Sequence, residues 1–365
     1  RPQGSLGTLD RLPAKVLEEH IVPLAGLSSF AAINSKARAL ALSVARHRAC
    51  AAADAISQGA PAPQGALLAM VREAHRYLDS RQGIAPGETL SDWAEAQDIA
   101  GNPHAGDAAY CLRQAIAFGA PSLDLGAMQL SCLPTCLPQL SLLQQLDLAS
   151  NELSALPEQL GELGALTHLN LEHNHLSTLP TGLSRLTALE HLMLTHNALH
   201  SLPCVVGSMG ALRTLEAGVN RISALPDSMA GLRSLTTLSL HENALRRLPA
   251  SVLQLEALQV LDVSDDSLRQ LPAQMGRLRQ LRFLNLNDNR LQAVGRQLID
   301  CRRLEALGLR GNPLREVPLH LWELPALQCI DLDIGLMGRL EAESLRPSSR
   351  RRCGSPAASR PPGAP

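Results

Sequence analysis

Leucines recur along most of the chain at a fixed spacing, and polar residues fill many of the positions between them. Each repeat reads L-x-x-L-x-L-x-x-N-x-L-x-x-L-P-x-x-L-x-x-L-x-x, and residues 166–188 show it in full. The alternation L-x-L predicts a short strand whose leucines point inward and whose intervening residue points outward. The later leucines, at three-residue spacing, predict a compact return segment that packs on the same core, beginning at the proline.

An asparagine, once replaced by aspartate, marks the turn that leaves each predicted strand. It recurs every 23 residues, without an insertion, at Asn151, Asn174, Asn197, Asn220, Asn243, Asp266, Asn289 and Asn312. Its side chain is suited to satisfy backbone groups at this turn, so stacked asparagines are expected to form a ladder. The register extrapolates to Met128 and Gly335, which gives about ten units over residues 119–340 with atypical outer units.

This pattern resembles the leucine-rich-repeat family, in particular the 23-residue class of Ras-pathway scaffolds, plant intracellular repeat proteins and bacterial type III effectors. The resemblance implies an α/β fold, a solenoid with a curved parallel sheet on its concave face. One unit cannot bury its leucine face alone, so stacking between neighbours is expected to stabilise the array.

The outward positions of the predicted strands form three columns, six, four and two residues before each asparagine position. We expect the partner-binding residues to be His168, Asn170, Glu172, His191, Met193, Thr214, Glu216, Ser239, His241, Asp262, Phe283, Asn285 and Arg310. The columns are polar and rather acidic, with apolar anchors at Met193 and Phe283. This composition favours a basic or mixed-polarity protein partner over nucleic acid, with ordinary solvated surface as the alternative for any single residue.

Seven of the twelve histidines fall between residues 168 and 241. His168 and His191 share one column, and His173 and His196 share the next turn. Such pairs suggest a metal site or pH-sensitive binding. The favoured interpretation is that repeat duplication copied an exposed histidine that the fold tolerates. Neither a metal site nor a cofactor is expected.

Residues 1–118 do not follow the repeat and predict a small all-helical domain. Within residues 46–118, a helical linker and N-terminal cap, helices are expected at 46–57 and 66–81. The segment 107–118 is expected to cap the solenoid, and Trp93 to pack in the helical body with Leu90. Residues 341–365 are rich in proline, serine, glycine and arginine, which predicts a disordered tail.

Residues 1–45 carry a second pattern, in which Leu12-Pro13 precedes spaced apolar residues and the segment ends in Ser35-Lys36 and Leu40. This segment resembles an F-box, which implies docking on a Skp-type adaptor of cullin ubiquitin ligases. The matching residues are Leu12, Pro13, Val16, Leu17, Ile21, Leu24 and Leu27. The motif's usual acidic residue and tryptophan are replaced here by Ala14-Lys15 and by Ala37 or Arg38. A helical cap with leucines facing the solenoid is the alternative.

Composition and charge reduce the number of function classes that the chain can belong to. The formal net charge is -1, so no global field favours nucleic acid or an anionic membrane. No stretch reaches the ~18 apolar residues of a membrane helix, and no signal peptide is in view. Lys15 and Lys36 are the only lysines, which argues against P-loop and kinase chemistry. The eight scattered cysteines predict reduced thiols of an intracellular environment, with Cys301 a small buried hydrophobe.

These patterns predict a protein-protein interaction module without catalytic residues. The arginine-rich, lysine-poor composition indicates a GC-rich bacterium, so an effector-type adaptor is preferred. Such an adaptor would be secreted into the host cytoplasm and would recruit a bound host protein to a cullin ubiquitin ligase. The alternative is a non-catalytic leucine-rich-repeat scaffold in intracellular signalling. An enzyme is expected only if the chain is a fragment of a longer protein.

Overall fold

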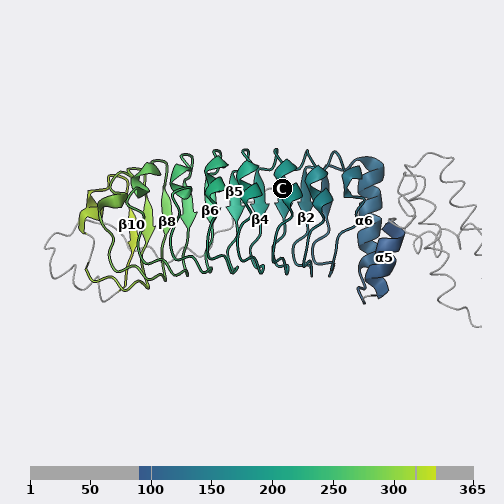
Figure 1. Ribbon diagram of the computed structural model, residues 1–365, viewed down its shortest axis with the longest axis horizontal. Coiled ribbons are helices and arrows are strands. Elements are labelled where there is room, and N and C mark those ends of the chain that lie inside the picture. Colours follow the sequence, from purple (N-terminus) through teal and green to yellow (C-terminus); the bar gives the residue numbers. More distant parts are fainter. Residues whose placement is uncertain (1–89, 100, 317–318, 334–365) are drawn as a thin grey trace, which may run out of the picture. The chain divides into compact units, whose positions relative to one another are not determined.

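The computed structural model describes residues 90–99, 101–316 and 319–333, which are the coloured ribbon of Figure 1. The chain divides into two compact units, and the second, which carries the repeats, begins at Gly119. The F-box-like segment, the helices expected at 46–57 and 66–81, and the tail at 341–365 lie outside the described residues. The domain boundaries and the small helical domain therefore stay predictions.

The first unit contains two described helices, α5 (Leu90–Ile99) and α6 (Ala105–Phe118). Helix α6 buries Leu112 and the alanines around it, and Leu90 is fully buried in α5. Helix α6 begins two residues before the predicted segment 107–118 and ends with it, and its capping of the solenoid stays a prediction. Neither described helix combines the length and the hydrophobicity of a membrane span.

The second unit is a stack of coils, each with one three-residue strand. The strands are β1 (Ser122–Asp124), β2 (Gln145–Asp147), β3 (His168–Asn170), β4 (His191–Met193), β5 (Thr214–Glu216), β6 (Thr237–Ser239), β7 (Val260–Asp262), β8 (Phe283–Asn285), β9 (Ala306–Gly308) and β10 (Cys329–Asp331). They pair in parallel and in sequence order, and the pairing joins repeat-equivalent residues such as Leu169 and Leu192. The predicted parallel sheet of about ten units is thereby confirmed.

The core lies behind this sheet and is made mostly of leucine. From Leu123 in β1 to Leu307 in β9, the middle residue of every strand is a leucine that is at most 6% exposed. The residues on either side of it keep contact with solvent. The prediction that leucines point inward while their neighbours point outward is confirmed. Cys301 takes an apolar position of the repeat and is fully buried, as predicted.

The return segments are short 3-10 helices. They are η4 (Leu137–Gln139), η5 (Glu158–Glu162), η6 (Thr181–Arg185), η7 (Cys204–Ser208), η8 (Asp227–Gly231), η9 (Val252–Gln254), η10 (Met275–Arg277), η11 (Arg296–Leu298) and η12 (Leu319–Glu323). An extended proline precedes each of η5 to η8, because its fixed φ and missing N–H suit the start of a helix. Strands pack only about 4.8 Å apart, and the bulkier return segments therefore bend the stack toward its sheet.

The asparagine ladder holds each coil to the one before it. In a typical rung, Asn174 Oδ1 accepts from the Leu153 N–H of the preceding coil at 3.0 Å. Its Nδ2 donates to Leu148 O of that coil at 2.9 Å and to Leu171 O of its own coil at 3.1 Å. The same three bonds recur at Asn151, Asn197, Asn220, Asn243, Asn289 and Asn312. The expected ladder thus satisfies buried backbone groups in every coil that carries the asparagine.

Candidate binding surfaces of the repeat unit

The solvent side of the sheet, with the two residues after each strand, forms a continuous surface that we call the strand face. Ten of the thirteen expected binding residues lie within strands β3 to β8. The other three, Glu172, His241 and Arg310, lie two residues beyond β3, β6 and β9. All thirteen keep contact with solvent, and Phe283 and Arg310 are the most exposed. The structure therefore brings these residues onto one surface.

Several polar residues of the strand face also fix its geometry. The Oδ1 atoms of Asp147 and Asp262 accept from backbone N–H groups two residues later, at 2.8 and 3.0 Å. Their Oδ2 atoms accept from the amides of Asn170 and Asn285 on the next strand, at 3.2 and 3.1 Å. Side chains that bond to nearby backbone in this way stabilise turns. These residues thus hold the turn and the surface in place as well as facing solvent.

The strand face is strongly acidic. Seven carboxylates stand on its three columns, against the single arginine Arg310: Asp124, Asp147, Glu172, Glu216, Asp262, Asp331 and Asp333. Burial raises the pKa of Glu216, and the negative charge of Glu172 raises it further, whereas His241 opposes the shift. A second acidic residue thus acts on Glu216 across the intervening strand. A partner with positive charge would relieve this repulsion.

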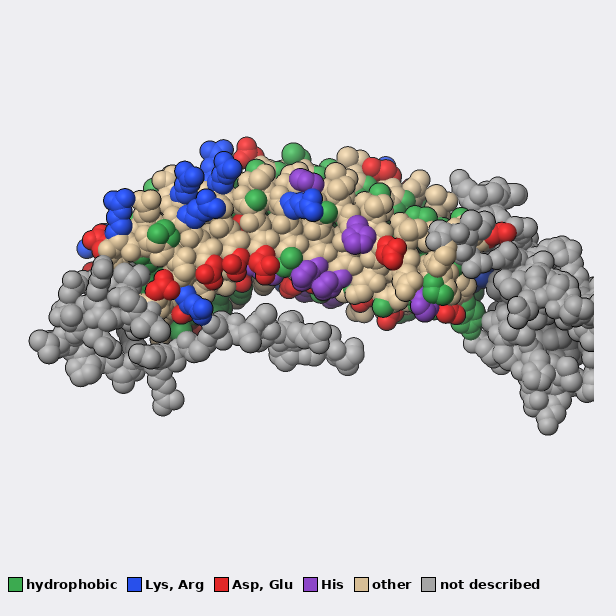
Figure 2. Space-filling model, turned by 90° about the horizontal axis from the view of Figure 1, so that it is seen from below, with side chains coloured by type: hydrophobic (Ala, Val, Ile, Leu, Met, Phe, Trp, Pro, Cys, Tyr) green, Lys and Arg blue, Asp and Glu red, His purple; other side chains and the backbone are tan. Residues whose placement is uncertain are grey.

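A further column, immediately before the ladder residues, runs along the edge of the strand face. Its members have positive φ, a conformation that costs free energy in residues other than glycine. They are Ala127, Ser150, His173, His196, Val219, Glu242, Asp265, Asp288 and Gly311. Burial raises the pKa of Asp265, and Asp288 and Glu242 raise it further through their charges. Figure 2 shows a row of acidic side chains and a pair of histidines along one margin of the unit.

This edge lies outside the three columns that the sequence predicts as the binding surface. The sequence signal was present, because histidine and aspartate tolerate positive φ and each occurs twice at this repeat position. The edge extends the acidic surface by Glu242, Asp265 and Asp288.

The histidine pairs stack face to face. The rings of His168 and His191 lie 4.4 Å apart, and those of His173 and His196 lie 4.1 Å apart. Burial lowers the pKa of His191, and the charge of His168 lowers it further. Within residues 90–99, 101–316 and 319–333, no three histidine, cysteine or acidic side chains lie close enough together to hold a metal ion. The stacked rings therefore offer a flat, partly apolar patch for contact with a partner.

The geometry agrees with known repeat structures. Residues 141–199, 233–291 and 256–314 match the family model described as leucine rich repeat. No curated protein matches the sequence significantly.

Three solved structures illustrate the likeness. The ectodomain of the plant membrane receptor kinase GASSHO1/SCHENGEN3 from Arabidopsis thaliana, in complex with CASPARIAN STRIP INTEGRITY FACTOR 2, is 26% identical with a TM-score of 0.55. The match covers 61% of this chain and 28% of that one. TLR13, in its complex with ssRNA13, gives the same identity and TM-score over 62% of this chain and 34% of that one. A repeat protein of Leptospira interrogans is 22% identical over 61% of this chain and 81% of that one, with a TM-score of 0.44.

Proposed function

Because the chain is a leucine-rich-repeat protein, we propose that it is a non-catalytic scaffold whose strand face binds a basic segment of a protein partner. The charge of the strand face supports this most directly, since its three columns carry seven carboxylates and only one arginine. The acidic edge column continues the same charge. Met193, Phe283 and the stacked histidines add apolar area, which suits a polypeptide with alternating basic and apolar side chains.

Two of the three similar structures described above are complexes, and they raise different expectations. TLR13 is in complex with ssRNA13, whereas GASSHO1/SCHENGEN3 is in complex with CASPARIAN STRIP INTEGRITY FACTOR 2. Nucleic-acid binding needs basic side chains that neutralise phosphates. The strand face here has the opposite charge, which favours a protein partner over RNA.

Anisotropy of a short fluorescein-labelled peptide, in which lysine alternates with serine, tests the proposal with the full chain. Glu172 and Glu216 make no side-chain hydrogen bond to described residues, so E172Q/E216Q removes charge without breaking an internal contact. We expect this variant to bind about tenfold more weakly, from two charge pairs of about 0.7 kcal/mol each.

The matched control is E152Q/E323Q, which removes the same charge from exposed positions off the strand face. It should bind the peptide as the wild type does. Equal weakening in both variants, or tighter binding of a single-stranded RNA than of the peptide, would overturn the proposal.

A more specific version of this proposal is that the chain is a bacterial protein delivered into the host cytoplasm. There it would recruit the bound protein to a cullin ubiquitin ligase. The sequence pattern at residues 12–40 is its support, and this segment lies outside the described residues. Capture of a purified Skp-type adaptor by the full chain, and its loss in L12A/L17A, is the expected result. No capture by the wild type would end this version and leave the scaffold proposal standing.

A further inference from the structure

A groove of about 1330 Å³ runs over the return segments η8 to η11, on elements other than the strands. Four arginines line it, together with two acidic residues and four glutamines. The charged lining residues are Arg233, Arg277, Arg279, Arg296, Glu256 and Asp300, and we call this region the arginine groove. Ala230, Ala273 and Gly276 also line it, and their small size leaves room for a ligand. The groove lies where the 3-10 helices shorten from five residues in η8 to three in η9 to η11.

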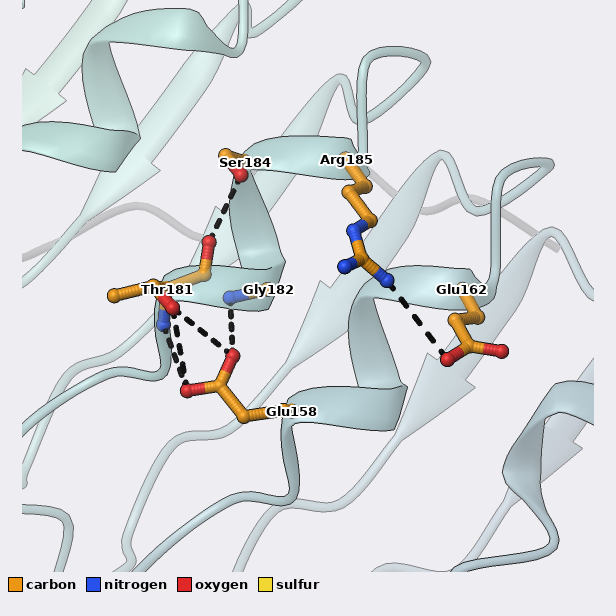
Figure 3. Close-up of polar contacts among 6 residues, drawn as sticks. All are labelled: Glu158, Glu162, Thr181, Gly182, Ser184 and Arg185. Carbon is orange, nitrogen blue, oxygen red and sulfur yellow. Dashed lines mark hydrogen bonds and ion pairs between the residues drawn. The ribbon is translucent and has the colours of Figure 1, made fainter.

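The equivalent flank of the earlier coils binds its own charges internally. Figure 3 shows Glu158 accepting from the Gly182 N–H at 2.5 Å and from Thr181 Oγ1 at 3.1 Å. The Gly182 N–H contributes most to a lowered pKa of Glu158. In the same view Arg185 Nη1 lies 3.8 Å from Glu162 Oε1, an ion pair between adjacent coils. These charged side chains thus have partners within the solenoid.

The arginines of the groove differ in this respect. Within the described part of the chain, the side chains of Arg233, Arg277, Arg279 and Arg296 make no hydrogen bond or ion pair, and all four residues are exposed. At the groove's border, by contrast, Arg282 forms a two-pronged pair with Glu305 at 2.8 and 3.1 Å. The groove therefore presents guanidinium groups whose hydrogen-bond donors face solvent and have no partner in the solenoid.

We propose that the arginine groove binds an acidic, extended segment of a protein, at a site separate from the strand face. A guanidinium binds a carboxylate through two parallel hydrogen bonds. Arg233 and Arg279 take the same repeat position two coils apart, so at strand spacing they lie at least about 10 Å apart. An extended segment of the polyproline II type advances about 3.1 Å per residue with three residues per turn, so carboxylates three residues apart lie on the same side and reach both arginines.

The lining favours a polypeptide over a nucleic acid. Single-stranded nucleic acids bind through aromatic side chains that stack on bases, and none of the residues that line the groove is aromatic. The four glutamines can donate to and accept from a peptide backbone. Glu256 and Asp300 lower the net charge of the groove and would repel a continuous run of phosphates.

The test measures anisotropy of a fluorescein-labelled peptide in which each glutamate is followed by two serines, mixed with the full chain. R277Q/R279Q should weaken binding about tenfold, from two exposed charge pairs. The control R246Q/R247Q removes the same charge from exposed residues of another flank and should change affinity less than twofold. Both variants should keep the melting temperature of the wild type.

Three outcomes would overturn the inference. They are an absence of peptide binding by the wild type, equal weakening by the two double variants, and tighter Arg277-dependent binding of single-stranded DNA than of the peptide. Binding of the lysine peptide to the strand face is measured separately, with different variants. Failure of one site is therefore distinguishable from failure of the other.

Discussion

At the scale of single residues, Asp266 departs most from the repeat, because it takes a ladder position without an amide. Its Oδ1 accepts from the Leu245 N–H at 2.7 Å, as an asparagine would. Its Oδ2 lies buried without a hydrogen-bond partner, on the side where other rungs carry the donating Nδ2. Burial raises the pKa of Asp266 to about 7. A retained proton would give this oxygen a donor toward the surrounding carbonyls.

The stability of the solenoid should therefore depend on pH through Asp266. The folded-state pKa lies above the ordinary value of 3.8, so the unfolded chain releases this proton first as pH rises. The contribution of Asp266 to the free energy of unfolding therefore falls by on the order of 4 kcal/mol between about pH 4 and pH 7. D266N abolishes this contribution. Urea unfolding from pH 4 to pH 8 should show that the free energy of unfolding of D266N exceeds that of the wild type by an amount that grows up to about pH 7 and is then constant.

The reciprocal variant N289D provides the control, since Asn289 is the next ladder residue along the chain and forms a complete rung. It places a second acid in the ladder and should lose stability over the same pH interval. If the difference between each variant and the wild type did not change with pH, the account of the protonated rung would be wrong.

The sequence predicts the ladder position of Asp266 from the 23-residue register alone. It does not predict the protonation state, which depends on how completely the neighbouring coils exclude water from Oδ2. Val219 is a similar case, because its register is clear but its positive φ of 49° is unusual for a β-branched residue. The neighbouring coils impose this backbone conformation on a residue that does not favour it.

At the scale of elements, contacts between adjacent 3-10 helices limit side-chain size. A Cβ atom added at Gly182 in η6 would overlap the main-chain carbonyl oxygen of Glu158 in η5. The same glycine N–H also donates to the Glu158 carboxylate. The close approach of η5 and η6 thus depends on the absence of a side chain at this position.

G182A should lower the free energy of unfolding by about 1–3 kcal/mol, because the two helices must separate. G210A is the matched control, since nothing lies within 4 Å of its added Cβ. It should leave stability unchanged or raise it by up to about 1 kcal/mol, through a less flexible unfolded chain. Equal effects of the two substitutions in chemical denaturation would contradict this account.

The prolines predict where the return segments begin, and η5 to η8 begin directly after them. The shortening to three residues in η9 to η11 has no equally clear signal in the leucine pattern. The arginine groove was not predicted for this reason, since a groove depends on how neighbouring return segments pack. Arg277 and Arg279 were visible in the sequence, but their lack of internal partners was not.

At the scale of the whole repeat unit, each coil contacts its neighbours in one register. Deletion of residues 198–220 removes one complete repeat and joins Asn197 to Arg221 in the correct register. We expect the shortened protein to fold cooperatively, with a melting temperature only a few degrees lower, because neighbour contacts are re-formed. Deletion of residues 198–208 moves all later leucines out of register. It should abolish the cooperative unfolding transition, as monitored by circular dichroism.

The deletion of a full repeat would contradict this interpretation if it unfolded the protein as completely as the half-repeat deletion does.

The acidic strand face predicted from the columns is present in the structure as one continuous surface. The sequence does not reveal the second charged surface, because the two lie on different segments of the same repeat. Figure 2 shows that charge is distributed unevenly over the solenoid, although the formal net charge of the whole chain is only -1.

The asparagine ladder also has a direction. Each rung serves the coil that precedes it, so Asn312 accepts from Leu291 N–H and donates to Leu286 O. Position 335 is a glycine, which offers no amide, and the Leu314 N–H donates to the Asn312 backbone oxygen instead. Damage to a rung should therefore loosen the upstream coil, and a coil added downstream completes the hydrogen bonds of the coil before it only if it brings its own asparagine.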